Sequence, residues 1–171
     1  MIEKEFVGTF SEEKMKLPVV TGSNLLRQSK KLPADLGGKL NLLFVPFQQW
    51  QQMEVNSWVP LMNELEQSHA DFRYYELPTI QHRNVLWQTF INEGMRAGIP
   101  DPAARHRTIT LYIDKKAFMS ASGLTDEEHV YLLLTDRAGN ILWRSRGEYS
   151  QEKAAELVMA VNELCLQAQS V

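Results

Sequence analysis

The chain has 171 residues, 44% of them hydrophobic, and a net charge of -3 from 18 basic and 21 acidic side chains. This length and hydrophobic content fit a single globular domain. The nearly balanced charge argues against nucleic acid as a partner, and no stretch approaches the ~20 apolar residues that membrane insertion needs. The first residues lack the basic start and apolar stretch of a signal peptide, so we expect a cytoplasmic protein.

The N-terminal half is expected to begin with an extension and to continue as strand, helix, strand. Residues 1–31 are polar and weakly periodic, which indicates short strands and loops packed on a core. Residues 40–47 are apolar on both faces and predict a buried central strand. Residues 53–67 carry apolar side chains three and four positions apart, as in an amphipathic helix, and Pro60 predicts a bend inside it. Residues 72–77 form the next expected strand.

The C-terminal half is expected to continue as helix, strand, hairpin and helix. Residues 84–96 predict a second helix, because a glycine and a proline follow closely. Residues 108–113 are rich in β-branched side chains and predict a third strand, and residues 130–144 indicate a hairpin. The last helix is expected to begin after Ser150, a good N-cap residue. This order predicts an α/β fold, with a mixed sheet and helices on both faces.

Three stretches are similar to redoxins in their order and spacing. Residues 32–47 resemble the lead-in and first central strand, and residues 58–65 resemble the kinked active-site helix, with Pro60 in the place of the family's helix proline. Residues 131–157 resemble the closing hairpin and helix. The chain therefore resembles the thioredoxin-like superfamily. The resemblance implies a three-layer α/β/α domain with a mixed central sheet over residues 32–171, preceded by the N-terminal extension.

The resemblance breaks at the redox centre. The family's two cysteines lie eight and five residues before the helix proline, and these positions hold Gln52 and Val55. The cis-proline expected before the third strand is replaced by Arg107 and Thr108. Since neither Gln52 nor Val55 can form a thiolate, we expect no thioredoxin or peroxiredoxin activity. The single cysteine, Cys165, lies on the apolar stripe of the last helix, where a buried thiol is inert.

The closing hairpin carries a narrower resemblance. Residues 131–143, followed by Gly147, are similar to the C-terminal motif of mitochondrial ATP synthase assembly factors. Those proteins have a redoxin-like domain without the active-site cysteines. The resemblance implies a role as an assembly chaperone.

Basic and polar side chains are expected to gather at one edge of the sheet, where the first helix also begins. Cations and free backbone donors of a helix start would together favour an anion or a carboxylate. The alternative is a set of separate, solvated loop charges. We expect the one large aromatic residue of this set to be partly packed. The candidate ligand-binding residues are Trp50, Gln52, His82, Arg83, Arg105, His106, Arg107 and Arg146.

The sequence contains no motif for a metal site or a phosphate-binding site. The four histidines lack the spacing of metal ligands, and there is no glycine-rich phosphate loop, so neither a metal nor a cofactor is expected. The acidic residues 126–128 are expected to form a solvated turn.

Three hypotheses for the function remain open at this point. The main one is a non-catalytic protein that binds a protein, a peptide or a small anion at the former active-site edge, with an assembly chaperone as its most concrete form. The second is a non-redox enzyme acting on a small acidic substrate at the same edge, with His82 or His106 in acid–base chemistry. The third is a structural or regulatory domain that forms a homodimer.

Overall fold

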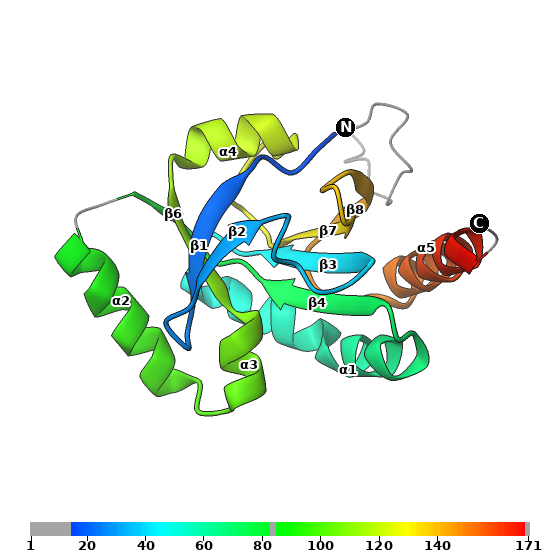
Figure 1. Cartoon of the computed structure of the whole chain (residues 1–171), viewed down its shortest axis with the longest axis horizontal. Helices are drawn as coiled ribbons and strands as arrows, with labels where there is room; N and C mark the ends of the chain where they lie inside the picture. The colour runs from blue at the N-terminus through cyan, green and yellow to red at the C-terminus, as the bar shows by residue number, and fades with distance from the viewer. Residues whose placement is uncertain (1–14, 83–84, 170–171) are drawn as a thin grey trace.

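A computed structural model describes residues 15–82 and 85–169. Over these residues the strands form two mixed four-stranded sheets, joined by one bridge, with helices on both faces (Figure 1), which confirms the expected three-layer α/β arrangement. In chain order the elements are β1 (Val20–Asn24), β2 (Ser29–Leu32), β3 (Leu40–Val45), η1 (Gln49–Gln51), α1 (Gln52–Ser68), β4 (Phe72–Glu76), β5 (Thr79–Gln81), α2 (Val85–Gly98), α3 (Pro102–Arg107), β6 (Ile109–Ile113), α4 (Lys115–Ser122), β7 (Tyr131–Asp136), β8 (Ile141–Arg146) and α5 (Gln151–Gln169).

Strand β3 lies inside the sheet and is covered on both faces. It pairs in parallel with β4, with Leu40 opposite Phe72, and antiparallel with β7, with Leu42 opposite Leu134. β8 pairs with the other side of β7 and completes this set. Every residue of β3 is buried, as its apolar pattern on both faces predicts.

A second set of strands extends the sheet beyond β4. β1 pairs antiparallel with both β2 and β6, and β5 pairs in parallel with β6. A single bridge between Glu76, at the end of β4, and Thr108, just before β6, joins the two sets. Residues 20–32, mostly within the expected extension, therefore belong to the sheet; the domain boundary at residue 32 stays a prediction.

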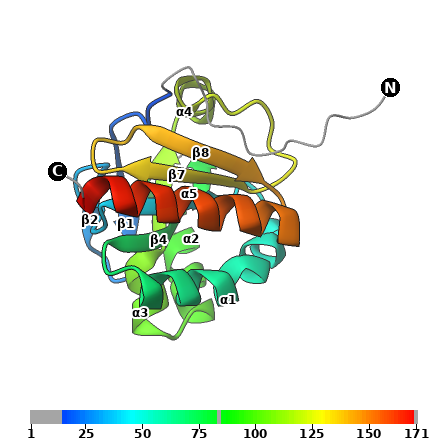
Figure 2. The same cartoon turned by 90° about the vertical axis from the view of Figure 1, so that its right-hand side faces the viewer.

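The apolar side chains form two clusters, one on each face of the sheet. The first packs under α1 and α5, which Figure 2 shows crossing the same face, and contains Trp58, Trp143 and Leu157. The second lies under α4 and the β1–β2 hairpin and contains Ile109 and Phe118. Because the sheet is covered on both faces, its functional groups are left at the strand ends and the loops.

The two longest helices match the sequence pattern. Pro60 lies inside α1, and α5 begins directly after Ser150, whose Oγ accepts a hydrogen bond from Lys153 N at 3.2 Å. Within residues 15–82 and 85–169, no helix is long and apolar enough to cross a membrane.

The sequence pattern does not predict α3 or α4, although the signals for both are present. Asp101 accepts a hydrogen bond from Ala103 N, and Asp114 accepts one from Ala117 N, so each helix begins with an aspartate cap. Helix α4 ends at Gly123, where φ is +70°, a left-handed conformation that favours glycine. Helices this short carry too few apolar residues to establish a period.

Candidate functional site

The two positions at which the sequence predicts the family's cysteines, Gln52 and Val55, lie in the first turn of α1. Gln52 is the first residue of the helix, and its Nε2 donates to Glu76 Oε2 at 3.3 Å and to Asn56 Oδ1 at 3.0 Å. Val55 is fully buried beneath the helix. One position is therefore partly exposed and the other enclosed, and neither side chain can become a nucleophile.

The single cysteine is far along the chain from this turn. Cys165 lies on α5, where it is half-buried and packs against the first core cluster. Its burial, together with the nearby Asp71 carboxylate, raises the pKa of the thiol. The enclosure predicted for Cys165 is thus partial, and the raised pKa reduces the thiolate fraction.

The backbone at the start of α1 is not open to an anion. The 3₁₀ turn η1 runs directly into α1, and the N–H of Gln52 donates to the carbonyls of Gln49 and Trp50. The side chain of buried Gln51 covers the preceding turn, since its Oε1 accepts a hydrogen bond from Phe47 N at 2.8 Å. The backbone N–H groups of Gln51 and Gln52, which the expected anion site would use, are therefore already paired.

Residues 127–130, directly before β7, lie against the start of α1. Gln51 Nε2 donates to the Glu127 carbonyl at 2.7 Å. The Glu54 carboxylate accepts the backbone N–H of Val130 at 2.8 Å and the ring Nδ1 of His129 at 2.6 Å. Three hydrogen bonds from two consecutive turns therefore hold this loop in place.

The expected place of the family's cis-proline needs correction. Arg107 and Thr108 lie directly before β6, beside the end of β4 and the C-terminal half of α1. The segment that contacts the start of α1 is a different one, residues 127–130, which precedes β7. Among the described residues, the cis peptide bond is between Leu32 and Pro33. The sequence interpretation chose the wrong strand because strand order in a sheet does not follow strand order in the chain.

Glu54 and His129 form a carboxylate–imidazole pair. The side chain of Glu54 is only 9% exposed, and its two hydrogen bonds offset the cost of burying a carboxylate near a helix N-terminus. His129 is half-exposed, and its ring stands edge-on to Trp50, with 6.1 Å between ring centroids. A carboxylate can only accept a hydrogen bond, so Nδ1 donates to Glu54, and Nε2 is the ring nitrogen outside this pair.

His129 and three neighbouring side chains form an exposed surface, called the α1-tip surface: Trp50, Met53, His129 and Tyr149. Trp50 is 52% exposed and Met53 is 75% exposed, and their spacing of three residues puts them on one side of the helix. Tyr149 is held one turn further along, since its N–H donates to Ser57 Oγ at 2.9 Å. The partial packing expected for Trp50 is thus confirmed, with half of its surface left free.

The arginines expected at this edge are already paired. Arg146 makes a two-pronged ion pair with Asp126, at 2.6 and 3.1 Å, and lies 5.2 Å from the centre of the Tyr131 ring. Although partial burial works to raise it, the pKa of Asp126 is lowered by the hydrogen bonds from Arg146 and a backbone N–H. Arg107 pairs with Glu66 at 3.3 Å. These cations carry little uncompensated charge for a ligand.

The acidic turn 126–128 is only partly the solvated turn that was expected, because Glu128 is exposed whereas the other two acidic residues are paired. Asp126 is bound by Arg146, and the Glu127 carboxylate is bound by Lys115. The hydroxyl of Tyr131 accepts the N–H groups of Thr125 and Asp126, each at 3.2 Å. The loop that carries His129 is therefore fixed at both its backbone and its side chains.

The remaining candidate residues do not share one neighbourhood. His82 N donates to the carbonyl of Ile113, at the opposite end of β6 from Arg107, so the expected grouping is wrong for His82. Arg105 donates to the carbonyls of Ile99 and Arg96 and caps the end of α2. His106 is exposed on α3. Arg83 lies outside the described residues.

Gln52 and Arg107 do meet around Glu76. The burial of the Glu76 carboxyl raises its pKa, against the opposing effects of the Gln52 hydrogen bond and the Arg107 charge. Arg107 also lies over the ring of Tyr74, 3.9 Å from its centroid. Gln52 and Arg107 are therefore close together as expected, but the group between them is the Glu76 carboxyl.

The sequence interpretation missed Met53, Glu54, His129 and Tyr149. One signal was available for Glu54: it precedes Trp58 by four residues and so falls on the buried stripe of α1, where a charged residue is unusual. His129 lies 75 residues further along the chain, and nothing in the sequence pairs the two. Within the described residues, no group of three or more His, Cys, Asp or Glu side chains is placed to hold a metal ion.

A mixed sheet, a helix with an interior proline after the central strand, and a closing hairpin and helix define a thioredoxin-like fold. Comparison with solved structures supports this assignment. The chain is similar to a thiol:disulfide interchange protein from Bacteroides sp., with 18% identity, a TM-score of 0.57, and 90% of this chain and 93% of that one covered.

Two further structures extend the comparison. BsSco, described as a member of the Sco family of cytochrome c oxidase assembly proteins, has 11% identity, a TM-score of 0.59 and coverage of 92% of this chain and 98% of its own. A DsbF homologue from Corynebacterium diphtheriae has 15% identity, a TM-score of 0.55 and coverage of 95% and 96%. Identities this low show the fold alone. No protein-family model and no curated protein matches the chain.

Proposed function

We propose that this protein is a non-catalytic thioredoxin-fold protein that binds an apolar segment of a protein partner through the α1-tip surface. The observation that carries the proposal is the exposure of Trp50 and Met53 at the helix start, on the structure that would otherwise present the redox centre. Large exposed apolar side chains are the usual anchors of protein interfaces.

The surroundings of this surface support binding rather than chemistry. The sequence holds a single cysteine, so no intramolecular disulfide can form, and Cys165 lies on another helix. The loop carrying His129 is fixed by Glu54, Gln51 and Arg146. A rigid surface loses little conformational entropy on binding, which favours affinity.

An assembly or chaperone role is the most concrete form of this proposal. It rests on the similarity of residues 131–143 to the ATP synthase assembly factors and on the fold shared with BsSco, described as an assembly protein of another complex. The partner segment is expected to be apolar and to contain an aromatic or aliphatic anchor, since the surface offers Trp50, Met53 and Tyr149.

Site-specific crosslinking tests this proposal. A photoreactive amino acid at position 53 is expected to capture a defined partner, and Trp50→Ala is expected to reduce the yield roughly tenfold, as for the loss of an interface anchor. The matched control places the same group at Met159, which is 62% exposed on α5. Equal capture from position 159, or capture unaffected by Trp50→Ala, would rule out the α1-tip surface as the binding site.

The Glu54–His129 pair gives specific support to a second candidate, a non-redox enzyme at the same place. A buried carboxylate that holds Nδ1 and leaves Nε2 free is the arrangement of a general base. His129, rather than His82 or His106, would be the base. Turnover of a small acidic substrate that is lost in His129→Gln and retained in Trp50→Ala would favour this candidate over the binding proposal.

A further inference from the structure

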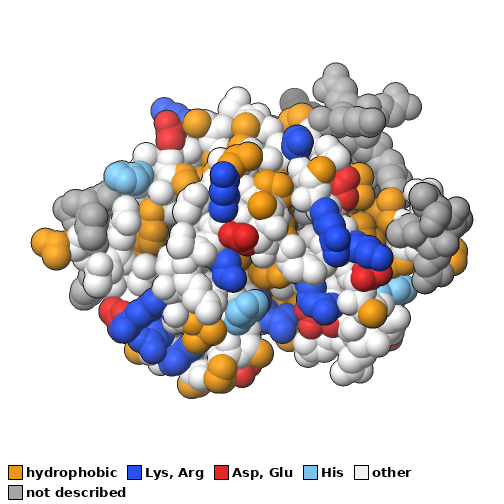
Figure 3. Space-filling model, in the orientation of Figure 1, with side chains coloured by type: hydrophobic (Ala, Val, Ile, Leu, Met, Phe, Trp, Pro, Cys, Tyr) orange, Lys and Arg blue, Asp and Glu red, His pale blue; other side chains and the backbone are white. Residues whose placement is uncertain are grey.

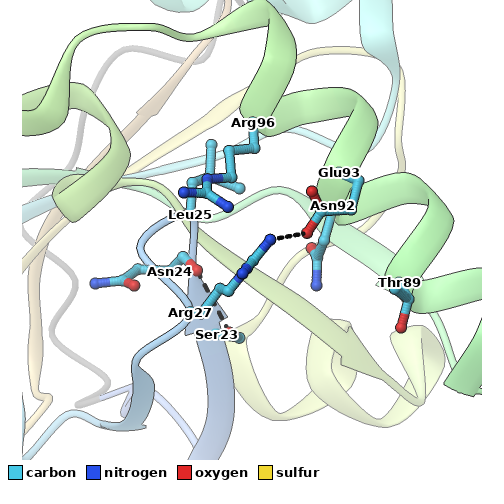
Figure 4. Close-up of a pocket in the computed structure, with 8 residues that line it drawn as sticks. All are labelled: Ser23, Asn24, Leu25, Arg27, Thr89, Asn92, Glu93 and Arg96. Atoms are coloured by element: carbon cyan, nitrogen blue, oxygen red, sulfur yellow. Dashed lines mark hydrogen bonds and ion pairs between the residues drawn. The ribbon is translucent and has the colours of Figure 1, made fainter.

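A separate hollow lies between the β1–β2 hairpin and α2, away from the α1-tip surface. It has a volume of about 190 Å³, and Figure 4 shows its side chains converging from both elements. The hairpin contributes Ser23 and Arg27, and α2 contributes Asn92, Glu93 and Arg96. Figure 3 shows Lys and Arg side chains gathered where the hairpin tip meets α2 and α3.

Arg96 brings an uncompensated positive charge to this hollow. Its carbonyl accepts a hydrogen bond from Arg105, but its guanidinium has no hydrogen-bond or ion-pair partner among the described residues. Arg107 and Arg146 differ in this respect, because each pairs with a carboxylate. A half-buried guanidinium with five free N–H donors is best satisfied by an oxyanion.

Arg27 reaches into the same hollow from the other side. Its Nη2 donates to Glu93 Oε1 at 3.0 Å, which leaves other guanidinium donors free. Its backbone has φ of 63°, in the left-handed region where glycine is the favoured residue. The tip of this hairpin therefore keeps an arginine at a position where the backbone conformation prefers glycine.

Two neutral side chains, Asn92 and Ser23, line the hollow beside the arginines. The hydroxyl of Tyr112 donates to Asn92 Oδ1 at 3.0 Å, which fixes the amide so that its Nδ2 is the group left for a ligand. Ser23 lines the hollow from β1, and its hydroxyl donates to the carbonyl of Asn24 at 3.4 Å. The wall between the two arginines is therefore polar.

We propose that this hollow binds a small oxyanion, an organic carboxylate or an inorganic phosphate, between Arg27 and Arg96. Two guanidinium groups and one carboxylate give the site a net charge of about +1. A volume of about 190 Å³ is below the range of roughly 300–1,000 Å³ for drug-sized ligands and well above that of a water molecule. A nucleotide is therefore too large, and a compound of a few carbon atoms fits.

Titration of the full-length, ¹⁵N-labelled protein with acetate, malonate and phosphate tests the proposal, with sodium chloride at equal ionic strength as the reference. At least one of the three anions is expected to cause saturable shifts in the backbone signals of residues 23–27 and 89–96. A carboxylate-selective response and a phosphate-selective response distinguish the two sources of the oxyanion. No saturable shift with any of the three, or shifts equal to those with chloride, would overturn it.

Three variants complete the test. Arg27→Gly suits the backbone at this turn, and Arg96→Gln preserves helix propensity, so both are expected to fold. Each is expected to weaken binding roughly tenfold, as for the loss of one charge-assisted hydrogen bond. Arg137→Ala, which removes an exposed arginine from the β7–β8 turn, is expected to leave binding unchanged. Unchanged affinity in both pocket variants, or an equal loss in Arg137→Ala, would place the anion elsewhere.

Discussion

Replacing Glu54 tests how the α1-tip surface is held. In Glu54→Ala, the backbone N–H of Val130 loses its acceptor while Val130 stays fully buried. An unsatisfied buried donor costs ~1–3 kcal/mol, and the hydrogen bond from His129 is lost as well. We therefore expect the free energy of unfolding to fall by ~2–3 kcal/mol, which corresponds to roughly 4–10 °C in Tm for a domain of this size.

Glu54→Gln separates hydrogen bonding from charge. Its side-chain oxygen can still accept the N–H of Val130, and its amide nitrogen can donate to Nδ1 of His129 after a change of tautomer. We expect a loss of only about 1 kcal/mol, and a smaller change in the environment of Trp50 than in Glu54→Ala.

Urea denaturation followed by tryptophan fluorescence and by circular dichroism measures both variants. Glu64→Ala is the matched control, because it removes an exposed carboxylate from the same helix. A fall for Glu54→Ala within about 0.5 kcal/mol of that for Glu64→Ala would refute the reasoning, since surface changes usually stay within that range.

Three further predictions concern charge and backbone. Because the pKa of Asp126 is lowered in the folded state, Asp126→Asn should cost up to about 1 kcal/mol at pH 6, and urea titrations should show this loss vanish as the pH falls below about 4. The pKa of Glu76 is raised, so removing its charge has the opposite effect on stability. Glu76→Gln should stabilise the protein at pH 7 and not at pH 3, and equal changes in stability at the two pH values would contradict this prediction. Gly123→Ala forces a side chain into a left-handed turn and should lower stability by about 1 kcal/mol, whereas Gly94→Ala, in open space on α2, should raise it; thermal unfolding that moves both in one direction would contradict this.

The central part of the fold follows from the sequence because it depends on long, regular patterns. Residues 40–47 are apolar on both faces, and α1 and α5 each keep an apolar stripe over several turns. Helices α3 and α4 and strand β5 lack such length. Only the capping residues Asp101 and Asp114 mark the two helices in the sequence. Local signals identify a helix start, but without a period they do not establish a helix.

The candidate site likewise has a part that follows from local sequence and a part that depends on distant contacts. Gln52 and Val55 could be placed by counting from Pro60, because positions within one helix are set by covalent connection. The pairing of Glu54 with His129 spans 75 residues and depends on which strand lies beside β3. The ion-pair partners of Arg107 and Arg146 are also distant in the sequence. Without knowledge of these partners, both arginines look available for a ligand, although each is already paired.

The start of α1 is unfavourable to a thiolate for a reason besides the absence of cysteine at positions 52 and 55. Glu54 occupies the backbone N–H of Val130, which lies opposite the helix start, and Glu76 contacts the side chain of Gln52 at 3.3 Å. A helix N-terminus normally lowers the pKa of a cysteine, but an adjacent carboxylate raises it. The position that would need a thiolate is therefore placed beside an acid.

Restoring a thiol tests this interpretation. In Gln52→Cys, the Glu76 carboxylate is expected to raise the thiol pKa by about one unit, and adding Glu76→Gln should reverse the rise. The pH dependence of alkylation by iodoacetamide measures both values, with Glu66→Gln as a control that removes a carboxylate paired to Arg107 but not in contact with Gln52. A Gln52→Cys thiol more acidic than free cysteine and insensitive to Glu76→Gln would mean that the helix start still favours a thiolate. In that case the expectation of no redox activity would rest on the missing cysteines alone.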